Sequence, residues 1–311
     1  MNKLTLGVDT SNYTTSLALC RDGEIIKSVR RLLPVSDGKC GLRQSDAVFL
    51  HTKALPELAD ELFAGDEYSK EDLCAVGVSA TPRDAEGSYM PCFLAGVSFA
   101  TAVSLSCGVP LYRFSHQAGH IMAGLLSSGV GDYPTKPFYA FHVSGGTTEA
   151  LLVTPRDGTY LCEIIGGTND ASAGQIIDRT GVLFGLPFPC GAALDKLASS
   201  SEKVLPIQSR VTGGYFSLSG LQNKCEKFHA DGETDADIAR FLFGSIARNL
   251  QRATENIRAE RGHAPVLYVG GVMSNSIIRA VLAKQKDVLF ASPALSSDNA
   301  CGIAALTYTR L

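Results

Sequence analysis

The sequence predicts an α/β protein made of two related domains around a central cleft, and three observations support this prediction. The chain has 311 residues, more than a single hydrophobic core usually holds. Two strand-turn-strand segments share one register, so that Asp9 in the first aligns with Ser144 in the second. In both segments an Arg-Asp-Gly turn follows, at residues 21–23 and 156–158. A register matched over two hairpins indicates an internal duplication.

Two related halves, each opening with a hairpin whose turn faces a shared cleft, are typical of the actin and hexokinase architecture, with a ribonuclease H-like core in each domain. The stretch 127–134 is rich in Gly and Ser, ends in Pro134 and is the most linker-like part of the chain. We therefore expect actin-like domains at 1–133 and 134–311, with the last helix able to pack back on the first domain.

Composition excludes several classes of protein. A hydrophobic content of 45% with 19% charged residues is typical of a compact soluble protein. The net charge of −3 provides no general attraction to nucleic acid or anionic membranes, so any RNA contact must be local or come from a partner. Nine cysteines without CxxC spacing indicate reduced thiols in a cytoplasmic protein. The most apolar segment, 92–109, contains several hydroxyl residues and is interpreted as a buried helix, not a membrane span.

Hydrophobic periodicity predicts the elements of each half. In the first half we expect a three-stranded meander, two long helices and two buried strands, at 4–9, 14–20, 24–32, 45–63, 93–107, 74–80 and 109–114. In the second half we expect a second meander from residue 138, helices at 170–184 and 235–260, and strands at 266–269 and 288–291. Residues 187–235 are expected to be irregular, with a short strand and turn at 215–220. A Ser-Ser-Asp-Asn cap at 296–299 is expected to open the closing helix.

Glycine-rich turns end several of the predicted strands, at 144–148, 166–168 and 270–271. Glycine lets backbone N–H groups approach an anion closely, and a helix that starts there adds a positive dipole end. These turns therefore predict a phosphate site. Any one Gly-Gly turn is also compatible with a simple hairpin, so the prediction depends on their number.

Two histidines, His116 and His120, are four residues apart on a predicted helix, a spacing that places both on one face and suits a metal ion. Such a pair can also be incidental. Gln117 stands where a zinc protease would have its general-base Glu, which disfavours that class. For Asp178 and Asp298 the sequence leaves two readings open: a ligand-binding carboxylate, or a solvated helix charge and a helix cap.

Motifs along nearly the whole chain resemble one family, that of the tRNA threonylcarbamoyladenosine transferase subunit, once called glycoprotease or O-sialoglycoprotein endopeptidase. Residues 7–11 resemble its opening GIETS, residues 116–120 its HxxxH, and residues 143–148 its VSGGHT. The further matches follow in the family's order: DDAAGEAFD at 170–178, YPGG at 188–191, FSFSGLK at 216–222, GGVAAN at 270–275 and TDNA at 297–300.

This resemblance implies roles for residues at matching positions. It implies one divalent ion, iron or zinc, bound by His116, His120 and Asp298, and it implies catalytic roles for Asp9 and Ser11. It also implies a site for ATP or threonylcarbamoyl-adenylate, formed by Ser144, Gly145, Gly146, Thr147, Asp178, Gly191 and Asn275.

The chain departs from the family pattern at several positions. Asn12, Tyr13 and Thr14 replace the family's Cys-Asp-Glu, which removes two acidic groups. Thr147 replaces a His and Gln222 replaces a Lys, and no Gly-Pro-Gly loop occurs at 83–87. These changes indicate a divergent paralog.

Three functions are compatible with the sequence. The first is transfer of a threonylcarbamoyl group from its adenylate to N6 of a tRNA adenosine. The expected partners are other subunits of a tRNA-modification complex, and no membrane is expected to be a partner. The second is a metal- and nucleotide-binding paralog that acts as a regulatory or assembly subunit, which the missing acids favour. The third, sugar or acetate kinase chemistry, leaves the HxxxH motif unexplained.

Overall fold

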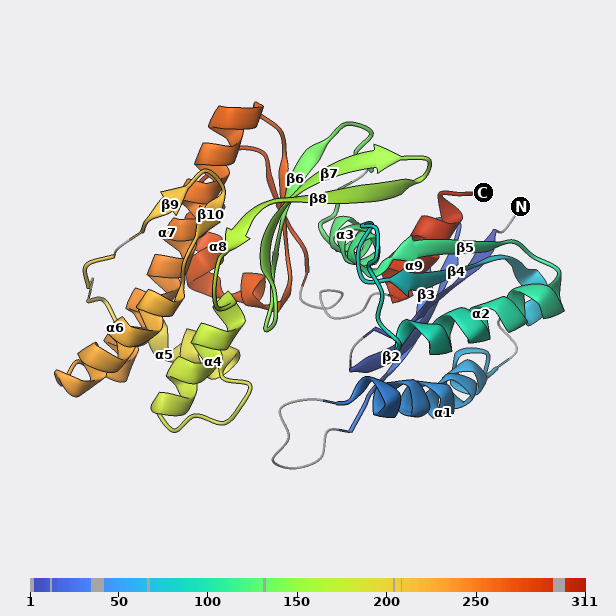
Figure 1. Ribbon diagram of the computed structural model, residues 1–311, viewed down its shortest axis with the longest axis horizontal. Coiled ribbons are helices and arrows are strands. Elements are labelled where there is room, and N and C mark those ends of the chain that lie inside the picture. Colours follow the sequence, from blue (N-terminus) through green and yellow to red (C-terminus); the bar gives the residue numbers. More distant parts are fainter. Residues whose placement is uncertain are drawn as a thin grey trace. The chain divides into compact units, whose positions relative to one another are not determined.

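The computed structural model describes residues 3–11, 13–34, 42–65, 68–130, 133–203, 205–207, 209–292 and 300–311. Within these residues the chain forms two β-sheets with helices packed on them, which confirms the predicted α/β fold (Figure 1). The chain divides into two compact units. The first combines Met1–Thr135, Thr154–Cys162 and Ala294–Leu311, and the second combines Lys136–Val153 and Glu163–Pro293.

The first unit is built on a sheet with the strand order β3-β2-β1-β4-β5. Strands β1 to β3 form the predicted antiparallel meander, and β4 and β5 continue it in parallel with β1. The strands are β1 (Leu4–Asp9), β2 (Thr14–Arg21), β3 (Glu24–Leu32), β4 (Leu73–Thr81) and β5 (Leu111–Ser115).

Helices cover the two faces of this sheet, as the alternation of side chains along β1 requires. Leu6 and Val8 belong to the apolar core under α1 (Gln44–Leu62) and α2 (Phe93–Cys107). Gly7 points the other way, where a Cβ would lie 2.2 Å from the carbonyl oxygen of Ala300 in α9 (Ala300–Tyr308). Glycine therefore lets α9 lie directly on the sheet. The remaining helices are α3 (His116–Ser127) and the 3-10 turn Lys70–Asp72.

The second unit contains a sheet with the strand order β12-β11-β6-β7-β8-β10-β9. Strands β6, β7 and β8 repeat the meander, and β11 and β12 run parallel to β6. The strands are β6 (Phe138–Val143), β7 (Thr148–Arg156), β8 (Thr159–Thr168), β9 (Val211–Thr212), β10 (Tyr215–Phe216), β11 (Val266–Val269) and β12 (Val288–Phe290).

Backbone geometry strengthens the evidence for duplication. Asp22 and Asp157 occupy equivalent places in the two Arg-Asp-Gly turns, and both have positive φ, of 51° and 46°. The glycine that follows each is also left-handed, with φ of 90° at Gly23 and 68° at Gly158. Two consecutive left-handed residues are the mark of the tight hairpin turn that joins twisted strands. The same sequence triplet therefore forms the same turn in each meander.

Helices of the second unit pack around the long helix α7 (Asp235–Arg261). Its residues Ile238, Leu242, Ile246 and Leu250 recur every four positions and are buried in one apolar core. The other helical segments are α4 (Ala173–Leu183), α5 (Gly191–Ala198), α6 (Ser219–Ala230), the 3-10 turn Gly271–Ser274 and α8 (Ser276–Leu282).

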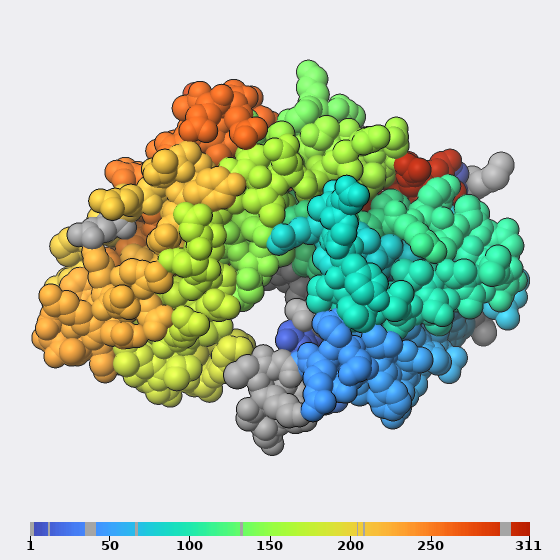
Figure 2. Space-filling view, viewed as in Figure 1, coloured from blue at the N-terminus to red at the C-terminus, as the bar shows by residue number. Residues whose placement is uncertain are grey.

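The short strand expected within 187–235 is β10, but the prediction that the rest is irregular was wrong, because α5 and α6 lie within it. Each is short and buries few side chains: Leu194 and Ala198 in α5, and Leu221 and Cys225 in α6. Helices of this length are marginal alone and are stabilised by packing on neighbouring helices. Figure 2 shows α6 in gold at the surface of the molecule.

Two expectations from composition can be compared with the described residues. Eight cysteines lie in the described part of the chain, and all eight are free thiols. None of the described helices has the length and apolar character that crossing a membrane requires.

Candidate functional site

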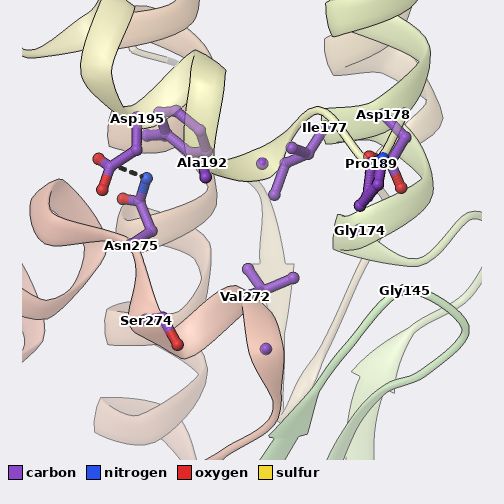
Figure 3. A pocket seen from close by; sticks show the side chains of 13 residues that line it. Gly145, Gly174, Ile177, Asp178, Pro189, Ala192, Asp195, Val272, Ser274 and Asn275 are labelled. Carbon is purple, nitrogen blue, oxygen red and sulfur yellow. Dashed lines mark hydrogen bonds between the residues drawn. The ribbon is translucent and has the colours of Figure 1, made fainter. Parts of the chain in front are cut away.

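A cavity of about 400 Å³ in the second unit is lined by several residues singled out in the sequence (Figure 3). Its walls come from the turn after β6, from α4, from the start of α5 and from the segment after β11. The lining residues are Gly145, Gly174, Ile177, Asp178, Pro189, Gly191, Ala192, Asp195, Phe243, Gly271, Val272, Ser274 and Asn275.

The turn between β6 and β7 is held by its own hydrogen bonds. The backbone N–H of Ser144 donates to the carbonyl of Thr147 (2.8 Å), and the N–H of Thr147 donates to Oγ of Ser144 (3.2 Å). At Gly145 and Gly146 a Cβ atom would meet nothing within 4 Å. The two glycines therefore border open space into which a ligand can come close to the backbone.

Helix α4 begins directly against this turn. Ser172 caps the helix, and its hydroxyl donates to the carbonyl of Gly145 at 2.6 Å. A Cβ on Gly174 would lie 2.5 Å from Cα of Gly145, so only glycine permits this approach. The positive end of the α4 dipole thus adjoins a glycine turn, an arrangement that favours a bound anion.

Asp178 links α4 to the next wall of the cavity. Its Oδ1 accepts a hydrogen bond from the backbone N–H of Cys190 at 2.8 Å, directly before Gly191 and the start of α5. The side chain is half-buried and lines the cavity. One carboxylate oxygen is therefore used to position α5, and the group stays at the cavity wall, where a ligand hydroxyl could donate to it.

Asn275 and Asp195 also line the cavity, and the dashed line in Figure 3 marks the hydrogen bond between them. Nδ2 of Asn275 donates to Oδ1 of Asp195 at 2.8 Å, while Oδ1 of Asn275 caps α8 by accepting from the N–H of Ile278. Gly270 allows this segment to approach β6, because a Cβ there would lie 2.3 Å from the carbonyl of Val143.

Sequence reasoning selected four lining residues of this cavity and missed others. Gly145, Asp178, Gly191 and Asn275 line it, and Ser144, Gly146 and Thr147 belong to the adjoining turn. Asp195 was missed although a signal existed: it follows Gly191 by four residues and so shares its helix face. The apolar lining residues Ile177, Val272 and Phe243 were not selected, although the first two lie within matched motifs, because apolar side chains are usually core positions.

Asp170, beside this region, is held by donors from two segments. It accepts hydrogen bonds from the N–H of Leu218 (2.8 Å) and from the N–H and hydroxyl of Ser219 (3.2 and 2.5 Å). Burial raises the pKa of this carboxyl, but the hydrogen bonds from Ser219, Leu218 and Thr168 outweigh it and lower the pKa to about 2. Asp170 therefore joins the start of α6 to the loop before α4.

The first unit contains a second group of predicted residues. Asp9, at the end of β1, is buried, and its Oδ2 accepts from the hydroxyl of Ser11 at 2.9 Å. Nδ1 of His116 lies 3.4 Å from the same oxygen. Burial raises the pKa of Asp9, but the positive charge and hydrogen bond available from His116, with the hydroxyls of Ser11 and Ser79, outweigh it and lower the pKa.

His116 and His120 occupy the first two turns of α3, as predicted, with ring centroids 4.5 Å apart. Imidazole nitrogens suit iron and zinc. In the described residues no three His, Cys, Asp or Glu side chains lie together closely enough to hold a metal ion. Asp298, the third expected ligand, and its capping segment lie outside the described residues. The described part of the chain thus contributes the two imidazoles of the expected donor set.

The departures from the family pattern have their own surroundings. Tyr13 and Thr14 are half-buried, and the carbonyl of Tyr13 accepts from the N–H of Leu33 at 2.7 Å. Gln222 accepts from Arg179 (3.1 Å) and donates to Glu226 (2.8 Å). Gln222 thus links α6 to Arg179 of α4.

A family model described as tRNA N6-adenosine threonylcarbamoyltransferase (TsaD) matches residues 41–305. The chain belongs to this family. A relative of that name from Bacillus licheniformis is 32% identical over 317 residues, which cover 96% of this chain and 89% of the relative. Another from Carboxydothermus hydrogenoformans is 30% identical over 322 residues, covering 100% and 93%.

Membership in the TsaD family shows that the chain is of a transferase type whose family activity is transfer of a threonylcarbamoyl group to tRNA. Solved structures agree on the fold alone. Component A of the (R)-2-hydroxyglutaryl-CoA dehydratase of Acidaminococcus fermentans has a TM-score of 0.59 at 17% identity, covering 98% of both chains. A ROK family glucokinase from Streptomyces griseus has a TM-score of 0.53 at 13% identity, also covering 98% of both. The actin/hexokinase-like fold is thereby confirmed.

Proposed function

We propose that this member of the TsaD family transfers a threonylcarbamoyl group from threonylcarbamoyl-AMP to N6 of a tRNA adenosine. The observation that carries the proposal is the cavity of the second unit. It combines a glycine turn, a helix N-terminus and a carboxylate in the wall of one 400 Å³ cavity, within a chain of this family. A mixed anhydride of AMP needs a place for its phosphate and one for its nucleoside, and the cavity offers groups for both.

The phosphate would bind at the turn of Gly145 and Gly146, where backbone N–H groups and the α4 dipole favour negative charge. The nucleoside would lie along the apolar lining, which includes Ile177 and Val272. Asp178 and Asn275 would then supply hydrogen bonds that fix its orientation. Because these groups are held by the backbone of α4, α5 and α8, the site needs little reorganisation to bind its ligand.

We also propose that His116, His120 and Asp298 would hold one divalent ion, iron or zinc. Such an ion, when bound, would supply Lewis-acid polarisation of a carbonyl oxygen. The role of Asp9 in this proposal is to accept from Nδ1 of His116, which fixes the ring and leaves Nε2 as the nitrogen that faces a ligand. Ser11 in turn holds the carboxylate of Asp9 in place.

A second candidate function is a metal- and nucleotide-binding subunit that regulates or assembles a modification complex. Tyr13 and Thr14 favour it, because they stand where the resembled pattern has two acids. Loss of a positioned general base or orienting carboxylate costs about 10²–10⁴ in rate. A protein with the cavity intact and these acids missing would bind its ligands and turn over slowly.

Partners follow from the charge of the chain. A net charge of −3 gives weak overall attraction to RNA, so we propose that other subunits of a tRNA-modification complex help to present the tRNA. We also propose that the protein is located in the cytoplasm.

The deciding experiment measures transfer of a labelled threonylcarbamoyl group from its adenylate to tRNA by the full chain. It is run with the chain alone and again with an extract of its own cells, which supplies the partner subunits. A TsaD relative serves as positive control. Label incorporated into tRNA at N6 of adenosine supports the transferase. Nucleotide binding without incorporation under conditions where the relative is active would favour the second candidate.

A further inference from the structure

We infer that a groove of the second unit, distinct from the nucleotide cavity, binds the sugar-phosphate backbone and an unpaired base of the tRNA. The groove measures about 850 Å³ and is lined by residues of β9, β10, α6 and α7 and of the segments beside them. Figure 1 labels these four elements in the second unit. This inference rests on the proposed function, since it names where that function's macromolecular substrate would lie. The lining residues are Asn169, Ile207, Ser209, Arg210, Thr212, Tyr215, Phe216, Ser217, Gly220, Leu221, Lys224, Asn249 and Arg252.

The lining of the groove is positively charged. Three of the lining residues are cationic, namely Arg210, Lys224 and Arg252, and none of the described lining residues is acidic. The whole chain carries a net charge of −3, so this groove is a local reversal of the overall charge. A protein without a general basic surface can by itself hold RNA only through such a local site. The nearest acid in sequence, Asp170, is occupied by backbone and hydroxyl donors at the start of α6.

The cations come from three different segments, which suits an extended anion. Arg210 directly precedes β9, Lys224 lies on α6 and Arg252 lies on α7. Nη1 of Arg252 donates to the carbonyl of Ser209 at 2.6 Å, so this guanidinium is fixed at the groove wall. Arg210 is exposed and makes no hydrogen bond or ion pair with any residue that the structure describes. The guanidinium groups of Arg252 and Arg210 and the amine of Lys224 thus come from three segments. Together they can bind successive phosphates of one strand.

Aromatic and polar side chains complete the features that single-stranded RNA requires. Tyr215 on β10 is 43% exposed and lines the groove, so its ring is available for a base to stack on. Asn249 is buried at the groove floor, where its Oδ1 accepts from the hydroxyl of Ser209 and its Nδ2 donates to Ser245. These two hydrogen bonds hold the side chain of Asn249 in place. An acidic protein segment would use the cations but has no need of an exposed ring in the same groove, and this favours RNA.

The test measures binding of unmodified tRNA to the full chain at about 50 mM salt by fluorescence anisotropy, followed by a salt titration. In Arg210→Gln with Lys224→Gln we expect weaker binding and a slope of log K against log salt that is smaller by about two, one for each lost phosphate contact. The matched control is Lys284→Gln with Lys286→Gln, which removes the same charge from exposed positions outside the groove lining. The control variant should show the same slope of log K against log salt as the parent.

A second pair of variants tests whether a base of the tRNA stacks on Tyr215. Tyr215→Ala should weaken binding of tRNA about fivefold or more, because stacking on one base is lost, whereas Tyr215→Phe should bind like the parent. Thermal unfolding of both variants checks that the short β9–β10 pair stays folded. Equal affinity of the Ala variant and the parent would overturn the stacking part of the inference, and with it the assignment to RNA.

The remaining outcomes separate this inference from the proposed function. Unchanged tRNA affinity in the Arg210 and Lys224 variant, equal losses in the control variant, or no tRNA binding by the parent would each overturn the groove as an RNA site. The first of these would point to an acidic protein partner instead. If the parent binds tRNA through the groove but transfers no threonylcarbamoyl group even with its partner subunits, the proposed function fails and the groove stands.

Discussion

The carboxylate of Asp9 lies 3.4 Å from Nδ1 of His116. This contact joins the end of β1 to the first residue of α3, although 106 positions separate the two residues in the chain (116 − 9 − 1). Because Asp9 is buried and its pKa is lowered, the group is an ionised acceptor that holds one edge of the imidazole. The other ring nitrogen is then the one that can face a ligand.

Removing this imidazole should remove the metal. We predict that His116→Ala retains less than half of the metal content of the parent, since one of three proposed protein ligands is lost. Elemental analysis of the purified proteins measures this directly. His263→Ala is the control, because His263 is an exposed histidine paired with Asp287 and should leave the metal content unchanged. Equal metal in the His116 variant and the parent would show that the ion, if present, is bound elsewhere.

The glycine turn gives a clean test of nucleotide binding. At Gly146 a Cβ meets no atom within 4 Å, so Gly146→Val should fold with an unfolding temperature close to that of the parent. The added side chain would fill the space proposed for the phosphate, and we expect at least a tenfold loss of affinity for ATP, or about 1.4 kcal/mol. Calorimetry measures the affinity of the parent and of the variant for ATP. A variant that binds ATP as tightly as the parent contradicts the phosphate assignment.

The missing acids separate the two candidate functions. We predict that the parent binds metal and nucleotide but modifies tRNA slowly or not at all without partners. Tyr13→Asp with Thr14→Glu should raise turnover by about 10²–10⁴ if a carboxylate at these positions acts as a base or orients the acceptor. The uncharged pair Tyr13→Asn with Thr14→Gln controls for side-chain size. If the parent alone modified tRNA at the rate of an active TsaD relative, the interpretation as a divergent regulatory or assembly subunit would be contradicted.

Asp170 should make stability depend on pH in the acid range. Its pKa in the folded chain is about 2, below the ordinary value of 3.8, so its carboxylate stabilises the fold at pH above 3.8. That contribution is lost as the pH falls from 3.8 to about 2, because the folded state then binds the proton that the unfolded state already holds. Asp170→Asn should therefore be less stable than the parent at pH 7, and the difference should shrink over this window.

Denaturant titrations of the parent and the Asp170→Asn variant at several pH values measure this difference. Asp287→Asn is a useful comparison, because the pKa of Asp287 is lowered mainly by an exposed contact with His263. Exposed pairs contribute little to stability, so its effect should be smaller at every pH. A constant gap between parent and Asp170→Asn would show that the hydrogen bonds to Ser219 and Leu218 do not favour the ionised form.

Local patterns in the sequence were enough for the regular elements. The alternation in β1, the four-residue spacing along α7 and the repeated Arg-Asp-Gly turns each depend on contacts between near neighbours in the chain. The same patterns were not enough for α5 and α6, because short helices with few apolar residues are stabilised by the helices that they pack on. Of the residues that line the cavity of the second unit, Gly145 and Asn275 were predicted from turns at strand ends, and Asp178 and Gly191 from the resemblance to the family.

The sequence by itself thus determined the α/β class, the duplicated meanders, the family and the pair of histidines on one helix, since each is written in spacing or in motif. Only the tertiary structure decided that Asp9 meets His116, that Asp195 holds Asn275, and that Arg210, Lys224 and Arg252 line one groove. The residues brought together in this way are 14 to 107 positions apart (224 − 210 and 116 − 9). No local pattern records them, because the packing of whole strands and helices brings such residues together.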